Sequence, residues 1–154
     1  MSLNPSIGRR TPSRGVKIEP GQPTILFLTV CATRPANWLA SQTVHNSLAS
    51  LWRSADTWLV GDYLLMPDHI HLFCSPRDLR FTVDRWVAYW KSQFSRQYTN
   101  SEWIWQRTSF HHRLRTPEEY REKLAYVRAN PVRKALVPAP ELWPFAGKIN
   151  TLHW

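Results

Sequence analysis

The order of hydrophobic patterns along the chain constrains its fold most. Continuous apolar, β-branched runs such as TILFLTVCAT predict buried strands, whereas apolar residues repeating every three or four positions predict amphipathic helices. The predicted strands are residues 24–33, two strands within residues 57–76, and residues 103–115. The predicted helices are residues 41–56, 80–99 and 116–134. The chain therefore begins with the order βαββαβ and ends with one more helix.

This order is that of a ferredoxin-like α+β fold, in which an antiparallel sheet carries its two helices on one face. The additional C-terminal helix has strong start signals, with Thr116 as N-cap, Pro117 at the first helical position and acidic residues in the first turn. Pro131 is expected to end or kink this helix, because proline has no backbone N–H to donate. We therefore expect a ferredoxin-like domain with an added C-terminal helix.

Composition divides the 154-residue chain into one domain and two flanking segments. Residues 1–22 are rich in Pro, Gly, Ser, Arg and Lys and lack a hydrophobic period, which predicts a basic, disordered arm. The folded domain is expected to cover residues 23–145, and residues 146–154 are assigned to a C-terminal tail. The Pro-rich but apolar residues after 135 are expected to wrap over the core.

The charge balance indicates a polyanionic partner. Twenty Lys and Arg against eleven Asp and Glu give a formal net charge of +9, which favours nucleic acid, although a basic surface that serves solubility alone is the alternative. Two cysteines, Cys31 and Cys74, are too few for a disulfide framework. No apolar run is long enough for a membrane span and no signal peptide is evident, so a cytoplasmic protein without membrane contact is expected. Most of the nine tryptophans are expected in the core.

The stretch MPDHIHLF contains the first candidate site. Pro and Asp favour a turn, so the histidines open a strand, where His69 and His71 point to the same face. Two imidazoles on one face can hold a divalent cation; exposed or hydrogen-bonded strand histidines are the alternative. His111 and His112 form a second cluster, but adjacent strand residues face opposite ways. At most one of these two can join the first pair, and both are interpreted as structural or DNA-facing.

The last helix contains the second candidate site. At about 100° per residue, Tyr120, Leu124 and Val127 fall on one stripe, which is the expected core face. Tyr126 lies roughly 120° from Tyr120, on the polar side of the helix. Asn130 follows one turn later at nearly the same angle, so a phenol and an amide project together. The alternative is an aromatic ring that lies on a polar face without a chemical role.

Two separated segments resemble a known family. YLLMPDHIHLF resembles the His-hydrophobic-His motif of single-tyrosine HUH nucleases and transposases. EEYREKLAYVRANPVRKALV resembles the tyrosine helix of one branch, the REP-associated tyrosine transposases, which are bacterial relatives of the transposases of the smallest insertion sequences. The intervening WQRTSFHHRLRTPEEY is also similar to that branch. The resemblance covers about residues 23–145, and both motifs occur in the family's order.

The resemblance implies a mechanism. Tyr126 would attack a phosphate of single-stranded DNA, leaving a 5′-phosphotyrosyl enzyme and a free 3′-hydroxyl. His69 and His71 would bind Mg2+ or Mn2+, with the amide of Asn130 as a third ligand. Asp68 would orient a histidine, or serve only to form the turn. In this branch the substrates are short DNA hairpins with unpaired flanking bases.

Basic residues supply the expected DNA contacts. Lys123, Arg128 and Arg133 would hold phosphates or act on the phenol, although a solvated basic helix face explains each of them too. Arg9 and Arg10 in the arm would follow the phosphate backbone.

Two other functions remain open from the sequence. One is a non-catalytic nucleic-acid-binding protein with a ferredoxin-like fold, and the other is a metal-dependent phosphodiesterase that activates water. A degenerate, inactive relative is a further alternative. The resemblance is compatible with a monomer or with a homodimer that exchanges tyrosine helices, and it implies a nucleoid-associated protein.

Overall fold

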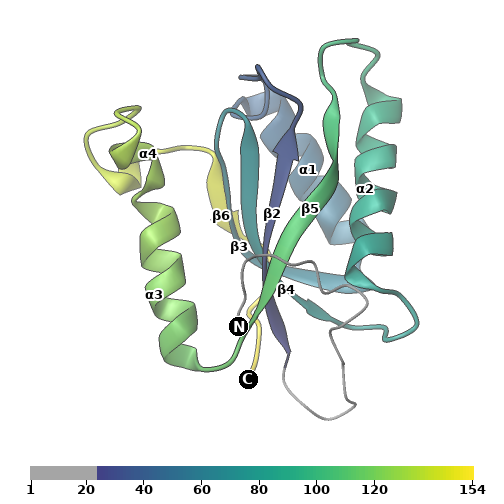
Figure 1. The fold of residues 1–154 in the computed structure, drawn as a ribbon, viewed down its shortest axis with the longest axis vertical. Helices are drawn as coiled ribbons and strands as arrows, with labels where there is room; N and C mark the ends of the chain where they lie inside the picture. The colour runs from purple at the N-terminus through teal and green to yellow at the C-terminus, as the bar shows by residue number, and fades with distance from the viewer. Residues whose placement is uncertain (1–23) are drawn as a thin grey trace.

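The computed structural model describes residues 24–154, in which one sheet has helices on both faces (Figure 1). The strands are β2 (Ile25–Ala32), β3 (Trp58–Leu65), β4 (His69–Pro76), β5 (Trp105–Leu114) and β6 (Ala146–Lys148). The helices are α1 (Gln42–Ser54), α2 (Val83–Gln97), α3 (Pro117–Arg128), the single turn α4 (Asn130–Arg133) and the 3-10 turn η1 (Pro140–Leu142).

The strand order across the sheet is β5-β2-β4-β3-β6, and every neighbouring pair is antiparallel. Helices α1 and α2 cover one face, and α3 stands against the other (Figure 1). The predicted βαββαβ order is confirmed, because β2, α1, β3, β4, α2 and β5 follow one another along the chain. The ferredoxin-like α+β class, with an added C-terminal helix, is therefore confirmed as well.

Side-chain caps fix where the helices begin. Ser41 caps α1, and Thr116, the N-cap that the sequence predicts for the last helix, forms a full capping box at the start of α3. The second helix begins at Val83 rather than at residue 80, because Thr82 takes extended backbone angles and its hydroxyl accepts a backbone N–H of the first turn. The turn expected between the two central strands lies at Pro67, where β3 ends and β4 begins.

The predicted helix over residues 116–134 is divided in two. Helix α3 ends at Arg128, and the short α4 starts at Asn130 with Pro131 in its first turn. Proline suits a first helical turn, where its missing N–H is not needed, but it cannot continue a helix. The expectation that Pro131 ends or kinks the helix is confirmed.

Tryptophan dominates the main core between the sheet and helices α1 and α2. Five of the nine tryptophans are buried there: Trp38, Trp52, Trp58, Trp86 and Trp90. Trp90 meets two of these rings edge to face, Trp52 at 5.6 Å and Trp86 at 6.0 Å between centroids. A smaller cluster on the opposite face packs α3 against the sheet through Val127, Leu64 and Phe73. The amphipathic patterns of the sequence thus correspond to two separate hydrophobic layers.

An irregularity in β3 brings an acid onto the α3 face. Val60 and Tyr63 both face the tryptophan core although they are three residues apart. The pairing of β3 with β4 shifts register between them, so the strand accommodates one extra residue. Asp62 therefore lies on the face toward α3, where it is buried and contacts that helix.

The edge strand β6 was not predicted from the sequence. It consists of three residues, too few for a hydrophobic period, and it pairs with β3 through Tyr63 and Gly147. A Cβ at Gly147 would lie 2.7 Å from the Tyr63 hydroxyl oxygen, so only glycine allows this close approach. Trp143, just before β6, donates a hydrogen bond to the carbonyl of Leu65 and packs on the smaller cluster. The apolar end of the chain thus covers part of the α3 face.

The predicted basic arm, residues 1–22 with Arg9 and Arg10, lies outside the described residues. None of the helices within residues 24–154 is long and apolar enough to cross a membrane.

The tryptophan core generates a stability prediction. Replacing Trp90 by Ala should lower the free energy of unfolding by about 3 to 5 kcal/mol, because the fully buried ring leaves a large cavity. The adjacent Tyr89, which is 56% exposed on the same helix, is the matched control, and its replacement by Ala should change stability by less than about 0.5 kcal/mol. Urea denaturation followed by tryptophan fluorescence measures both. Equal losses in the two variants would contradict this account of the core.

Candidate active site on the open face of the sheet

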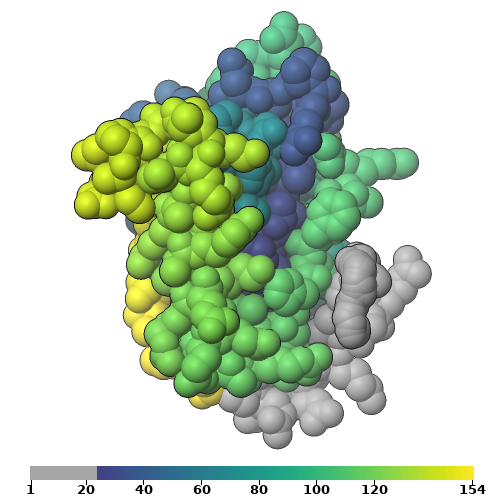
Figure 2. Space-filling model, turned by 60° about the vertical axis from the view of Figure 1, so that its left-hand side comes forward, coloured from purple at the N-terminus to yellow at the C-terminus, as the bar shows by residue number. Residues whose placement is uncertain are grey.

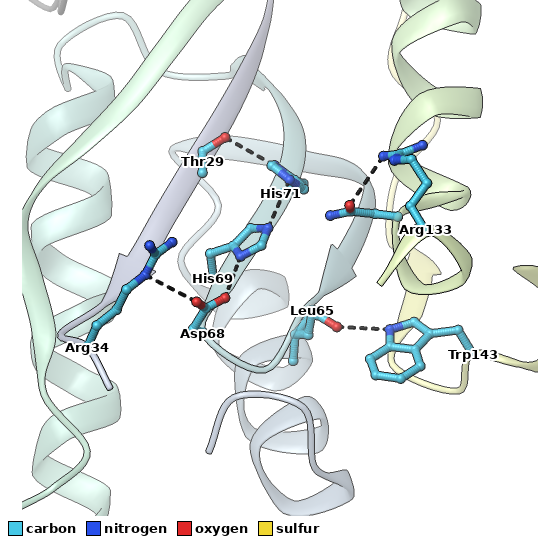
Figure 3. A network of polar contacts seen from close by, with 9 residues as sticks. Thr29, Arg34, Leu65, Asp68, His69, His71, Arg133 and Trp143 are labelled. Atoms are coloured by element: carbon cyan, nitrogen blue, oxygen red, sulfur yellow. Dashed lines mark hydrogen bonds and ion pairs between the residues drawn. The ribbon is translucent and has the colours of Figure 1, made fainter. Parts of the chain in front are cut away.

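The two histidines of β4 converge. His69 and His71 face α3, because Ile70 between them points into the tryptophan core. Their Nε2 atoms lie 3.1 Å apart, and their ring centroids 4.6 Å apart (Figure 3). The prediction that both imidazoles share one face is confirmed.

The other nitrogen of each imidazole has its own partner (Figure 3). Nδ1 of His69 donates to the Asp68 carboxylate at 2.7 Å, and Arg34 pairs with the second carboxylate oxygen at 3.1 Å. Burial acts to raise the pKa of Asp68, but the hydrogen bond and charge of His69 and the charge of Arg34 outweigh it and lower this pKa. Nδ1 of His71 lies 3.0 Å from the hydroxyl of Thr29. With both Nδ1 atoms held, the two Nε2 atoms are directed to one point.

The environment keeps His71 uncharged. Burial lowers its pKa to about 3, with further lowering by the positive charges of His69, Lys123 and Arg133. A neutral imidazole with its Nδ1 hydrogen-bonded is the form that ligates a metal, so the pair fits a divalent cation. Across residues 24–154, no three His, Cys, Asp or Glu side chains are grouped to hold a metal ion. A third protein ligand within this region would have to be of another type, such as the amide of Asn130.

Tyr126 projects from α3 into the same region. Its side chain is 61% exposed, and the Arg133 guanidinium lies over its ring, 3.8 Å from the centroid. The ammonium of Lys123 lies 6.0 Å from the same ring and 5.0 Å from the ring of Phe27. Phe27 in turn stacks on His71 with centroids 5.2 Å apart. A continuous series of contacts therefore joins the tyrosine to the histidine pair.

Asn130 meets Tyr126 through Arg133. Asn130 is buried at the start of α4, and its amide oxygen accepts a hydrogen bond from the Arg133 guanidinium at 3.2 Å. The same guanidinium nitrogen donates to the backbone carbonyl of Tyr126 at 2.8 Å. Figure 3 shows Arg133 on the helical segment that faces the two histidines. Arg133 thus links the Asn130 amide to the backbone and ring of Tyr126 at the junction of α3 and α4.

The other tyrosine of this helix has a structural role. The hydroxyl of Tyr120 donates to the buried carboxylate of Asp62 at 2.6 Å, and its ring lies 4.4 Å from that of Phe73. Burial and the hydrogen bond to Asp62 raise the pKa of Tyr120. Arg128 reaches the second oxygen of Asp62 at 3.3 Å. Tyr120 is therefore a fixed hydrogen-bond donor, whereas Tyr126 is free of packing on the sheet.

The second histidine cluster divides between the two faces, as expected for adjacent strand residues. His111 is buried on the α2 side, with Nε2 3.7 Å from the carboxylate of Asp84. His112 lies on the α3 face, where its ring contacts Phe27 at 5.8 Å. Burial, followed by the charge of Lys123, lowers the pKa of His112. His112 thus contacts Phe27, which in turn stacks on His71.

The basic residues predicted to bind DNA differ in how close they lie to Tyr126. Lys123 and Arg133 flank Tyr126, as the contacts above show. Arg128 is occupied in part by its ion pair with Asp62, although its side chain is 60% exposed. Arg9 and Arg10 lie outside the described residues.

Sequence reasoning missed four residues of the site: Phe27, Thr29, Arg34 and Asp62. An acid inside the apolar run LVGDYLL was a usable signal for Asp62, because a buried carboxylate needs partners. The contact of Thr29 with His71 depends on the pairing register of β2 with β4, which no local pattern reveals. Arg34 lies in a loop, where its contact with Asp68 had no sequence signal.

A ferredoxin-like sheet that presents two convergent imidazoles toward a helix with an exposed tyrosine has the layout that the resemblance implies for single-tyrosine HUH proteins. No family model matches the chain. A curated relative from Haemophilus influenzae, named as a REP-associated tyrosine transposase, is 31% identical over a match that covers 53% of this chain. The match covers 54% of the relative, so the chain spans about half of that protein's length.

A solved structure of a REP-associated tyrosine transposase bound to a REP hairpin has the same fold. Its TM-score is 0.68 with 23% sequence identity, over 85% of this chain and 80% of the other. The curated relative agrees with the family indicated by the two sequence motifs, and the solved structure shares the fold. The resemblance of this chain to REP-associated tyrosine transposases is therefore confirmed.

The different environments of the two α3 tyrosines predict different effects of their replacement on the free energy of unfolding. Replacing Tyr120 by Phe should lower the free energy of unfolding by about 1 to 3 kcal/mol, because the buried Asp62 carboxylate loses a donor. Replacing Tyr126 by Phe, the matched control on the same helix, should change stability by less than about 0.5 kcal/mol. Urea denaturation measures both. A larger loss from the Tyr126 variant would show that the assignment of the two tyrosines is reversed.

Proposed function

We propose that this protein is a transposase of the single-tyrosine type: a metal-dependent single-stranded DNA endonuclease and strand transferase that cleaves beside a DNA hairpin. The observation that carries the proposal is the placement of an exposed tyrosine, Tyr126, in the same site as the convergent Nε2 atoms of His69 and His71. The similarity to a curated transposase and to a hairpin-bound structure of the same fold supports it.

The metal in this proposal is Mg2+ or Mn2+. His69 and His71 would hold it, with Asn130 as the proposed oxygen ligand, since hard cations favour oxygen and imidazole shifts the preference toward Mn2+. When bound, the metal would polarise the scissile phosphate and neutralise charge that develops on it. Asp68 and Thr29 keep the two imidazoles in the required orientation through their Nδ1 atoms.

Tyr126 is the proposed nucleophile. Its phenol loses a proton, and its oxygen forms a bond to the phosphorus while the bond from phosphorus to the 3′ oxygen breaks. The departing 3′ oxygen takes up a proton, which leaves a free 3′-hydroxyl and a 5′-phosphotyrosine. Because the phosphodiester is conserved in this linkage, a 3′-hydroxyl can reverse the step and join strands without ATP. A phenolate leaves more readily than an alkoxide, which suits tyrosine to this reversal.

Two cations are positioned to hold the phosphate. Arg133 lies over the ring of Tyr126 and Lys123 lies between this ring and Phe27. Arginine and lysine both bind phosphate oxygens, the first through its planar fork and the second as a point charge. Their position beside the phenol supports a role in placing the scissile phosphate.

The proposed substrate is a DNA hairpin with unpaired flanking bases. The net charge of +9 fits a phosphate backbone and predicts binding that weakens steeply with salt. A monomer that completes its own site is one proposed assembly. A homodimer that exchanges tyrosine helices is the alternative assembly.

The proposal predicts a covalent protein–DNA adduct. Wild-type protein incubated with hairpin-bearing single-stranded DNA and Mn2+ should give a slowly migrating adduct on a denaturing gel. Tyr126→Phe should give none, because the attacking oxygen is absent. Tyr120→Phe is the matched control and should still form the adduct, since Tyr120 is committed to Asp62.

Two other outcomes would overturn the proposal. Cleavage that persists in Tyr126→Phe without an adduct would identify a phosphodiesterase that activates water. Binding of hairpins without cleavage of any, across a panel of genomic hairpins, would identify a non-catalytic DNA-binding protein.

The metal site can be tested without the reaction. Isothermal titration with Mn2+ should show one site in the wild type and none in His69→Ala. Asp68→Ala should weaken binding by about 10- to 100-fold, because it removes the partner that orients His69. His112→Ala, on the same sheet face, is the control and should bind as the wild type does. Unchanged Mn2+ affinity in His69→Ala would contradict the proposed ligands.

A further inference from the structure

An exposed aromatic ring lies on the same sheet face as the histidine pair. Phe110 on β5 is 53% exposed and pairs across the strands with Thr29, whose other neighbour is His71 on β4. These three residues therefore form a row across β5, β2 and β4, with their side chains on one face. Two strand spacings place the Cα atoms of Phe110 and His71 about 10 Å apart.

Among the described residues, no helix covers the ring of Phe110, which is 53% exposed. Helix α3 packs above β3 and β4, through Tyr120 against Asp62 and Phe73. Figure 2 shows the surface hollowed between α3 and β5, with the purple of β2 at the floor of the hollow. Phe27, on β2, is only 8% exposed because neighbouring rings and Lys123 surround it. Phe110 thus remains open to solvent at the β5 side.

We infer that Phe110 is a stacking platform for an unpaired nucleobase of single-stranded DNA, next to the phosphate that Tyr126 attacks. The inference rests on the proposed function and adds a residue that distinguishes single-stranded from double-stranded DNA. A base on Phe110 would lie about one or two nucleotides from a phosphate held at the histidine pair, since both belong to the same row.

The chemistry of the hollow favours an unpaired strand. An aromatic side chain stacks on the π-face of any base, so the contact is tolerant of sequence, but in a duplex these faces are covered by neighbouring base pairs. Lys123 supplies positive charge beside the floor of the hollow, and the chain as a whole carries +9. The platform is continuous with the candidate active site through Thr29, which pairs with both Phe110 and His71.

The test measures binding in EDTA, so that neither metal nor cleavage takes part. Fluorescence anisotropy compares a labelled oligothymidylate, an abasic phosphodiester strand of the same length, and a duplex. Phe110→Ala should weaken binding of oligothymidylate by about 5- to 100-fold and leave the abasic strand and the duplex unchanged. Phe110→Tyr should bind as the wild type does. Tyr89→Ala, an equally exposed aromatic on α2, is the control and should have no effect.

Three outcomes would overturn the inference. The first is equal affinity of the wild type and Phe110→Ala for oligothymidylate. The second is an equal loss for the abasic strand, which would show an effect on phosphate binding rather than on stacking. The third is a change of oligomeric state in Phe110→Ala by sedimentation velocity, which would assign the ring to contact with a second copy of the chain. A failure of the proposed nuclease function would give a different result. The Tyr126 adduct would be missing, but Phe110→Ala would still weaken binding of oligothymidylate selectively.

Discussion

The antiparallel pairing of β2 with β4 positions the whole candidate site. Its register sets Thr29 opposite His71, and it is fixed by the residues of both strands that are buried among the tryptophans, such as Val30 of β2 and Ile70 of β4. A slip of one residue would turn the histidines into that apolar layer and expose Ile70. Hydrophobic burial on one face of the sheet therefore determines the positions of the imidazoles on the other. The polar contacts with Asp68 and Thr29 only refine a geometry that the core has already set.

The placement of Tyr126 depends on a second, smaller set of contacts. Helix α3 is joined to the sheet by a modest apolar cluster and by the buried carboxylate of Asp62, which accepts from Tyr120 and pairs with Arg128. A buried carboxylate is unfavourable without such partners, so this group specifies where the helix must sit. Tyr120 and Tyr126 differ in position around the helix axis by roughly a third of a turn. That difference places one phenol in the packing layer and the other in the site.

Local patterns in the sequence were sufficient for most of the fold. Alternation and helical spacing predicted the strands and helices, the shared face of His69 and His71 and the core stripe of α3, because each depends on residues close in sequence. Contacts across the chain were not predictable in this way. The hydrogen bond of Thr29 with His71 and that of Asp62 with Tyr120 join residues distant in sequence, and β6 is too short to have a period.

The two faces of the sheet have different roles: one stabilises the fold, and the other leaves the candidate site accessible to solvent. One face is covered by α1 and α2, which enclose a core with five buried tryptophans. The other face is covered by α3 over part of its width, and Figure 2 shows a hollow between α3 and β5. If both faces were equally covered, the imidazoles and the phenol would be sealed from a polymeric substrate. Because the tryptophan core already stabilises the sheet, the chain can leave this second face partly open, and the side chains of the candidate site lie on that face.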